Sequence, residues 1–239
     1  MKRFYINTSQ LEGKFIDNEE FLHMKNVLRM KEGDDFIAFC NSESDYHCTI
    51  TQIKKDLLTF DIDDETINSA NPSIKLDLFQ SLAKGEKLEL VAQKATEIGV
   101  STIFPLFVKN CDVKPNSNKP TRLNKIVISA CKQCGRSMVP TIEEIITLKQ
   151  AIPILDTYDL VLFANETEST TSLIESLPQI KNTSSTKIAV IIGPEGGFTQ
   201  EEICELRNRY KSVSLGKRIL RTETAAIYIL SVVRDYYRI

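Results

Sequence analysis

The sequence predicts two domains, a small β-rich domain followed by an α/β domain with a mainly parallel sheet. The chain has 239 residues, 42% of them apolar, which suffices for one large or two smaller hydrophobic cores. Short strand-like segments dominate up to residue 70, whereas strands and helices alternate from Ile74 onward. The polar, turn-rich stretch 68–73 separates the two patterns. We therefore expect domains at 1–70 and 74–239.

The first domain reads as several short strands and one helix. Phe21, Met24, Val27 and Leu28 recur at helical spacing and predict a helix over Glu19–Leu28. The expected strands are 4–6, 35–39, 48–53 and 57–62. Short strands around a single helix suggest a small barrel.

In the second domain, segments with the spacing of a strand alternate with segments with the spacing of a helix. The expected strands are 75–82, 102–108, 159–164, 188–192 and 213–215. The expected helices span 86–98, a stretch from about 121 that follows a loop with Pro115 and Pro120, about 169–177, a stretch after Thr199, and a stretch from near Thr222. Residues 182–186 read as a loop.

Composition excludes some classes of protein. MKRFYIN at the N-terminus lacks the apolar region of a signal peptide, and no apolar run approaches a membrane span. Six cysteines in a chain of this length do not suggest a disulfide scaffold, so we expect a cytoplasmic protein. With only two histidines, His23 and His47, no hydrolase triad can be assembled, which favours chemistry driven by a cofactor.

Charge is unevenly distributed although the net charge is only −2. Residues 1–70 carry a net charge of −6, and residues 71–239 carry +4. Between 109 and 136, seven Lys and Arg residues face a single acid, Asp112. This cluster could hold phosphates or could be a solvated surface, and the residues alone leave both interpretations open.

Cys131 and Cys134 have the spacing of half a zinc site. A structural zinc needs four ligands, and no second pair of cysteines or histidines accompanies them. We therefore expect free thiols on the apolar face of a helix, and no metal.

Residues 187–203 carry the most informative pattern. A β-branched run, Ile188–Ile192, breaks at Gly193-Pro194-Glu195-Gly196-Gly197, and Thr199 with Glu202 forms a predicted capping box. A glycine-rich loop between strand and helix leaves backbone N–H groups free for a ligand, although it could also be a simple turn. It is neither GxGxxG nor a P-loop. A second strand–turn–helix follows, with Arg218, Arg221 and Glu223 near its turn, where an anionic transition state could be stabilised.

Five ordered motifs together resemble one family. They are HMKNVLRMKEGD (23–34), KGEKLELVAQKATEIGV (84–100), ISACKQCGRSMVP (128–140), GPEGG (193–197) and LGKRILRTETA (215–225). The chain resembles the SPOUT class of S-adenosylmethionine methyltransferases, and more narrowly the 16S rRNA (uracil-N(3)) methyltransferases of the RsmE type. The resemblance covers nearly the whole chain. The −6 charge of the first domain departs from what an independent RNA binder would need.

The resemblance implies a PUA-like β-barrel for RNA binding, then a methyltransferase domain whose C-terminal segment forms a trefoil knot, and a homodimer. S-adenosylmethionine would bind in the knot. The implied cofactor-binding residues are Ala164, Gly193, Pro194, Glu195, Gly196, Gly197, Leu215, Gly216, Ile219, Leu220, Thr222, Thr224 and Ala225.

The implied substrate is a uridine of 16S rRNA in the small ribosomal subunit, methylated at ring nitrogen three. Arg221 is the expected catalytic residue, with Arg29 or Arg136 assisting. Glu223 or Glu97 could accept the proton or could only orient an arginine. The expected RNA-binding residues are Arg3, Arg29, Lys109, Lys132, Arg136 and Arg218. Two other functions stay open: a related enzyme acting on tRNA or on a ribose 2′-OH, and a non-catalytic RNA-binding or ribosome-assembly factor.

Overall fold

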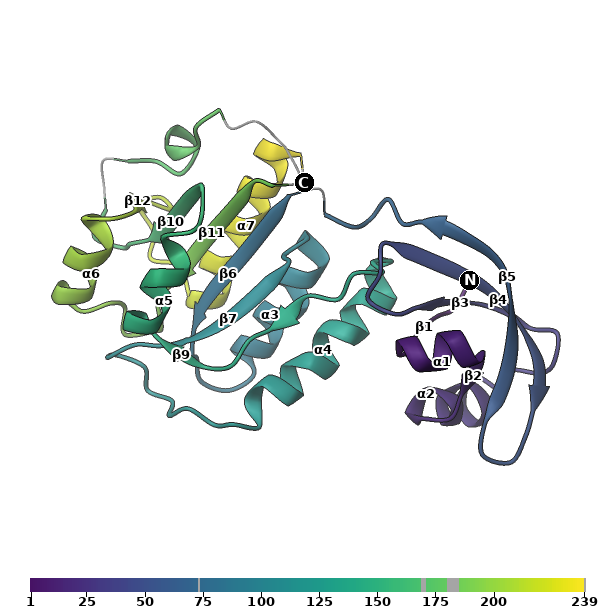
Figure 1. Ribbon diagram of the computed structural model, residues 1–239. Coiled ribbons are helices and arrows are strands. Elements are labelled where there is room, and N and C mark those ends of the chain that lie inside the picture. The colour runs from purple at the N-terminus through teal and green to yellow at the C-terminus, as the bar shows by residue number, and fades with distance from the viewer. Residues whose placement is uncertain (73, 169–170, 180–184, 239) are drawn as a thin grey trace. The chain divides into compact units, whose positions relative to one another are not determined.

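A computed structural model (Figure 1) describes the chain except for residues 73, 169–170, 180–184 and 239. The chain divides into two compact units. The first comprises Met1–Asn71 and Cys131–Val139, and the second comprises Pro72–Ala130 and Pro140–Ile239. The sequence patterns did not indicate that 131–139 belongs to the first unit.

The first unit contains a five-stranded mixed sheet in the order β1-β3-β4-β5-β2. Its strands are β1 (Arg3–Tyr5), β2 (Phe15–Ile16), β3 (Asp35–Phe39), β4 (Ser44–Ile53) and β5 (Leu58–Ile67). Strand β1 pairs with β3 in parallel, and the other pairings are antiparallel. The rings of Phe4, Phe36 and Phe60 meet edge to face in its core.

The helical part of the first unit differs from the expected single helix. The pattern over 19–28 is split into α2 (Glu19–Leu22) and a π-helical turn, η1 (His23–Val27). A further short helix, α1 (Thr8–Gly13), was not expected. It is held by a capping box in which Asn7 and Gln10 exchange hydrogen bonds with each other's backbone. With only 6 residues, α1 is too short for helical periodicity to reveal it.

The second unit contains a parallel sheet in the order β12-β10-β11-β6-β7-β8, with β9 also pairing with β7. Its strands are β6 (Lys75–Ser81), β7 (Thr102–Phe107), β8 (Thr141–Ile142), β9 (Ile146–Thr147), β10 (Leu160–Ala164), β11 (Lys187–Ile192) and β12 (Lys211–Val213). Strands β7, β10 and β11 are near-continuous apolar runs because both faces of the sheet are covered, and every residue of β6 after Lys75 is buried as well.

The helices of this unit are α3 (Lys87–Ile98), α4 (Lys119–Cys134), of which Cys131–Cys134 belong to the first unit, α5 (Leu148–Leu155), α6 (Gln200–Arg207) and α7 (Thr222–Tyr237). Helices α5 and α6 cover one face of the sheet, and α3 and α7 pack against each other on the other (Figure 1). Helix α4 begins two residues earlier than expected, so Pro120 lies in its first turn, where proline is tolerated.

In this unit one helix was not expected, and one expected helix differs from the structure. Helix α5 was missed because Pro153 interrupts its pattern, although Thr147 and Gln150 form a capping box at its start. Within the expected helix 169–177 the described residues form only a short 3₁₀ turn, η2 (Ile174–Ser176), and residues 169–170 lie outside the described part. The expected loop 182–186 also lies largely outside it. None of the helices that the structure describes is long and apolar enough to span a bilayer.

The topology places three loops at one edge of the parallel sheet. Strand β10 lies between β12 and β11, so the carboxyl ends of these three strands are neighbours (Figure 1). Ligands in open α/β sheets bind at the carboxyl ends of strands.

Candidate active site

A pocket of about 560 Å³ lies within the second unit at the carboxyl edge of its sheet. Three segments line it: the loop after β10, the glycine-rich loop after β11, and the segment between β12 and α7. The lining residues are Lys87, Ala164, Asn165, Glu166, Ile192, Gly193, Pro194, Glu195, Gly197, Phe198, Ile203, Ser214, Leu215, Gly216, Lys217, Arg218, Ile219, Leu220, Arg221, Thr222 and Ala225.

A side chain would be crowded or strained at Gly193, Gly196 and Gly197 of the glycine-rich loop, and at Gly196 a Cβ would lie 3.1 Å from the backbone oxygen of Asn110. Gly197 has a φ of +64°, a conformation that L side chains rarely adopt. A Cβ atom there would also lie 3.3 Å from a carboxylate oxygen of Glu166. At Gly193 a Cβ would lie 3.1 Å from the ring of Phe198. The loop then enters α6 through the expected capping box of Thr199 and Glu202.

The loop also hydrogen-bonds to the start of α7. The hydroxyl of Thr222 donates to the carbonyl oxygen of Gly193 at 2.7 Å, and the amide of Gln80 donates to that hydroxyl at 2.9 Å. Gln80 is fully buried in β6, and Thr222 is nearly so. These bonds connect a central strand to both motifs of the pocket.

The segment between β12 and α7 is the exposed side of the pocket. Ile219 is 83% exposed, and Arg218 and Arg221 are also exposed. Within the described part of the chain, the guanidinium groups of Arg218 and Arg221 make no hydrogen bond or ion pair with protein. Two uncommitted cations at a pocket are suited to an anionic ligand or transition state.

Two acids of the pocket, Glu195 and Glu166, differ in their contacts and in their exposure. Glu195 forms an ion pair with Lys87 at 2.7 Å. Partial burial alone would raise the pKa of Glu195, but the hydrogen bond from Lys87 and those from backbone N–H groups lower it below its ordinary value. Glu166 is exposed on the turn after β10, which Asn165 stabilises by accepting a hydrogen bond from the backbone N–H of Thr167.

Eleven of the thirteen residues expected to bind a cofactor line this pocket, and Gly196 and Thr224 do not. The carbonyl oxygen of Gly196 instead accepts a hydrogen bond from the side chain of Asn110 at 3.1 Å. Thr224 is exposed on α7. Direct contact of the eleven with a cofactor stays a prediction.

The resemblance implied that the loop after Ala164 would also enclose the cofactor, but sequence reasoning did not name its lining residues Asn165 and Glu166, and it missed Lys87. The signal for the first two was their place directly after a parallel strand, where ligands bind in such sheets. Nothing in the sequence pairs Lys87 with Glu195, because the two positions are 108 residues apart.

Of the expected catalytic residues that belong to the second unit, one lines the pocket. Arg221 lines the pocket, but Glu223 does not. One carboxylate oxygen of Glu223 is buried and has no hydrogen-bond partner among the described residues. Glu97, the alternative acid, is already paired with Lys94 at 2.9 Å.

Arg29 and Arg136 belong to the first unit. Arg29 is exposed and has a φ of +51°. Arg136 is only 3% exposed, and burial lowers the pKa of its guanidinium. Such burial does not favour the expected role of Arg136 in RNA binding.

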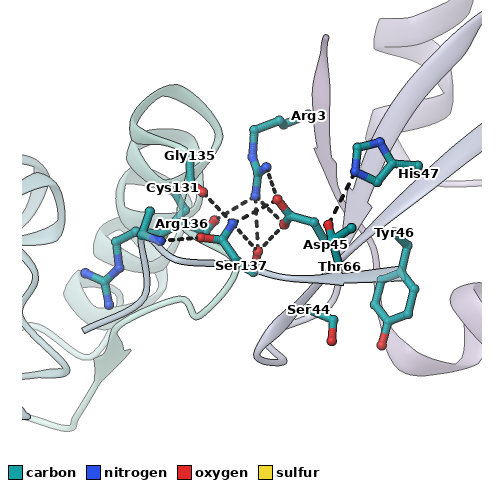
Figure 2. A network of polar contacts seen from close by, with 12 residues as sticks. Arg3, Ser44, Asp45, Tyr46, His47, Thr66, Cys131, Gly135, Arg136 and Ser137 are labelled. Carbon is teal, nitrogen blue, oxygen red and sulfur yellow. Dashed lines mark hydrogen bonds and ion pairs between the residues drawn. The ribbon is translucent and has the colours of Figure 1, made fainter. Parts of the chain in front are cut away.

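The expected RNA-binding residue Arg3 has another role in the structure. Its guanidinium makes two hydrogen bonds to the carboxylate of Asp45, at 2.5 and 2.7 Å, and one to the hydroxyl of Ser137 (Figure 2). Asn68 adds bonds to Asp45 and to the carbonyl oxygen of Gly135. This network fastens 135–137 to the sheet of the first unit and leaves Arg3 only 11% exposed.

The remaining expected RNA contacts differ in exposure. Lys132 is ion-paired with Glu20, whereas Lys109 and Arg218 are exposed. Cys131 is a buried free thiol whose pKa burial raises to about 12, and Cys134 is a partly buried free thiol.

Comparison with known proteins identifies the family. A model described as RNA methyltransferase domain matches residues 69–234, and one described as RNA methyltransferase PUA domain matches 16–63. A relative from Rickettsia conorii, named ribosomal RNA small subunit methyltransferase E, is 34% identical, with 97% of this chain and 94% of the relative covered.

The solved structures that match nearly the whole chain include the following two. A Legionella pneumophila protein in complex with bound S-adenosylmethionine has a TM-score of 0.87 and 33% identity, with 99% of this chain and 98% of the other covered. Ribosomal RNA small subunit methyltransferase E from Neisseria gonorrhoeae, bound to S-adenosyl methionine, has a TM-score of 0.85 and 28% identity at the same coverage. The chain therefore belongs to the family of RNA methyltransferases whose curated members are named ribosomal RNA small subunit methyltransferase E.

Proposed function

We propose that this protein transfers a methyl group from S-adenosylmethionine to ring nitrogen three of a uridine in 16S rRNA of the small ribosomal subunit. The observation that carries the proposal is the pocket that the loops after β10 and β11 and the segment 214–222 form together, with Arg221 in its lining. Family membership and the ligand named in the two structural neighbours support the cofactor.

The pocket has the chemistry that this cofactor requires. Its volume of about 560 Å³ lies in the range of small-molecule sites. Ile192, Leu215 and Leu220 provide apolar surface for an adenine ring, and the glycine-rich loop provides backbone polar groups for the remainder. The expected knot, in which the C-terminal segment passes through a loop, would hold these segments together. When bound, S-adenosylmethionine supplies an activated methyl group on a positively charged sulfur.

Arg221 is the proposed catalytic residue. Negative charge spreads onto the carbonyl oxygens of uracil when ring nitrogen three loses its proton, and a guanidinium placed beforehand stabilises that charge by about 3 kcal/mol. Arg221 caps the start of α7 without a side-chain cap bond, so its side chain is available for this role. Glu223 is the better proton acceptor of the two acids considered, because Glu97 is committed to Lys94.

We further propose that the first unit, which matches a PUA model over 16–63, binds rRNA through Arg29, and that Lys109 and Arg218 contact phosphates. The enzyme would act in the cytoplasm, as a homodimer. Because residues 1–70 carry a net charge of −6, RNA affinity must depend on local rather than overall charge.

The experiment is methyl transfer to small ribosomal subunits. We expect tritiated methyl incorporation, and mass analysis of digested 16S rRNA nucleosides should show 3-methyluridine. Arg221→Ala should lower turnover about a hundredfold or more while binding of S-adenosylhomocysteine persists. Arg209→Ala is the matched control, since Arg209 is an exposed arginine of the same unit that pairs with Asp156 and does not line the pocket.

Near-normal turnover of Arg221→Ala would refute the role of Arg221. Methylation of tRNA or of a ribose 2′-OH would refute the substrate, and the lack of any methyl transfer would favour the RNA-binding or assembly factor.

A further inference from the structure

The glycine-rich loop is attached to the segment that leads into α3. One carboxylate oxygen of Glu195 accepts a hydrogen bond from the ammonium group of Lys87 at 2.7 Å and another from the backbone N–H of Lys84 at 3.2 Å. Both side chains line the pocket and are partly buried, with exposed fractions of 31% for Lys87 and 25% for Glu195.

A second contact holds the same loop from the segment after β7. The side-chain amide of Asn110 donates to the carbonyl oxygen of Gly196 at 3.1 Å. Asp112, on the same segment, pairs with the ammonium group of Lys84 at 2.8 Å. The segments after β6 and β7 are therefore connected to each other and to residues 195–196.

The placement of Lys87 has a cost that Glu195 offsets. Lys87 is the first residue of α3, where the positive end of the helix dipole disfavours a cation. The carboxylate of Glu195 neutralises that charge and accepts an N–H just before the helix. Because these contacts lower the pKa of Glu195, its carboxylate is ionised at neutral pH.

We propose that Lys87 and Glu195 are positioning residues, which hold the glycine-rich loop in the conformation that binds the cofactor. The proposal rests on the proposed function and assigns Glu195 a role other than direct contact with the ligand. The loop is held through Glu195, through the bond from Asn110 to Gly196, and through the bond from Thr222 to Gly193. It therefore loses little conformational entropy when a ligand binds.

The experiment measures binding of S-adenosylhomocysteine by calorimetry to the full chain and to Lys87→Met, Glu195→Gln and the double variant. Each single variant should weaken binding about three- to tenfold, and the double variant should bind no more weakly than the weaker single variant. In methyl transfer, the variants should raise KM for S-adenosylmethionine and leave kcat within about twofold of the wild-type value.

Arg122→Met is the matched control. Arg122 on α4 pairs with Glu89, which lies on α3 like Lys87, and the distance is also 2.7 Å, but neither Arg122 nor Glu89 lines the pocket. The affinity of the Arg122→Met variant for S-adenosylhomocysteine should equal that of the wild type. If Lys87→Met lowers the melting temperature but does not weaken ligand binding, the ion pair between Lys87 and Glu195 only stabilises the fold. That result would overturn the proposal.

Two further outcomes would also contradict it. Weak binding by Glu195→Gln with normal binding by Lys87→Met would mean that Glu195 touches the ligand directly. Losses that add up in the double variant would mean that the two residues act independently. Failure of the wild-type protein to bind S-adenosylhomocysteine would instead contradict the proposed function, so the two failures are distinguishable.

Discussion

The hydroxyl of Thr222 lies 2.7 Å from the carbonyl oxygen of Gly193, and this hydrogen bond joins the first residue of α7 to the first residue of the glycine-rich loop. The same hydroxyl accepts a bond from Gln80, so it is both donor and acceptor inside the protein. Two segments of the pocket are thus joined by the side chain of Thr222, a residue that is only 6% exposed. A substitution at Thr222 should therefore change the conformation of both segments.

Thr222→Val tests this connection. Valine keeps the shape but removes the donor to the carbonyl oxygen of Gly193, and it leaves the amide of Gln80 only its bond to the carbonyl oxygen of Ser81 at 3.2 Å, which costs about 1–3 kcal/mol. We expect lower stability in urea and weaker binding of S-adenosylhomocysteine in calorimetry. Thr222→Ser, which retains the hydroxyl, should restore most of both. Equal behaviour of the two variants would argue against the hydrogen bond as the cause.

Gly197→Ala tests the backbone of the glycine-rich loop. At a φ of +64° an alanine is strained by about 1–2 kcal/mol, and its methyl group would press on Glu166. Affinity for S-adenosylhomocysteine should fall roughly tenfold, as calorimetry would show. Gly33→Ala is the control, because Gly33 also has a positive φ, +88°, but belongs to the first unit and has open space around it. It should lower stability and leave ligand affinity unchanged; equal losses in both variants would contradict the prediction.

Apolar runs and capping residues predicted much of the secondary structure of the second unit, because both kinds of signal depend only on residues that are close together in the sequence. The run Ile188–Ile192 and the pair Thr199 and Glu202 are such local signals, and the structure confirms both. Eleven of the expected cofactor residues line one pocket because they lie at or after the carboxyl ends of three strands that the topology brings together.

What the sequence did not reveal depends on contacts between distant positions. Asn110 contacts Gly196 across 86 residues, and Arg3 contacts Ser137 across 134. Arg3 was expected to bind RNA only through the family resemblance, and its partner Asp45 lies on another strand. Periodicity carries no information on such pairs, so the placement of 131–139 in the first unit could not have been predicted from it.

Asp45→Asn tests the network of Figure 2 through its pH dependence. Burial alone would raise the pKa of Asp45, but hydrogen bonds from Arg3, Ser137 and Asn68 lower it below its value in the unfolded chain. The carboxylate therefore contributes stability above that unfolded value, and the contribution is lost as pH falls through the folded pKa. At pH 7 the variant should be less stable by about 3 kcal/mol, because Arg3 keeps a partly buried charge without its partner.

Urea unfolding of the wild type and Asp45→Asn between pH 7 and pH 3 checks this prediction, and the difference should shrink towards pH 3. Asp61→Asn is the control, since Asp61 makes an exposed ion pair with Lys14 at 3.3 Å and should change stability little. A difference that does not depend on pH would contradict the role of the Asp45 charge.

Asp77→Asn should show the opposite pH dependence. Asp77 is fully buried in β6, where one carboxylate oxygen accepts the hydroxyl of Tyr158 at 2.5 Å. Burial raises the pKa of Asp77, although Tyr158 and the half-exposed Lys75 lower it in part. The folded protein then holds this proton more tightly than the unfolded chain, so the contribution of Asp77 to stability falls as pH rises from the unfolded pKa through the folded one.

The melting temperature of Asp77→Asn relative to the wild type should therefore rise between pH 4 and pH 8, by roughly 2–4 °C for each kcal/mol in a chain of this size. Tyr158→Phe removes the hydrogen bond that favours the charged carboxylate, so it should steepen the decline of wild-type stability with pH. Differential scanning calorimetry across this range measures both effects. A relative melting temperature of Asp77→Asn that falls with rising pH would mean that the buried carboxylate is stabilised as an anion, by contacts stronger than its desolvation.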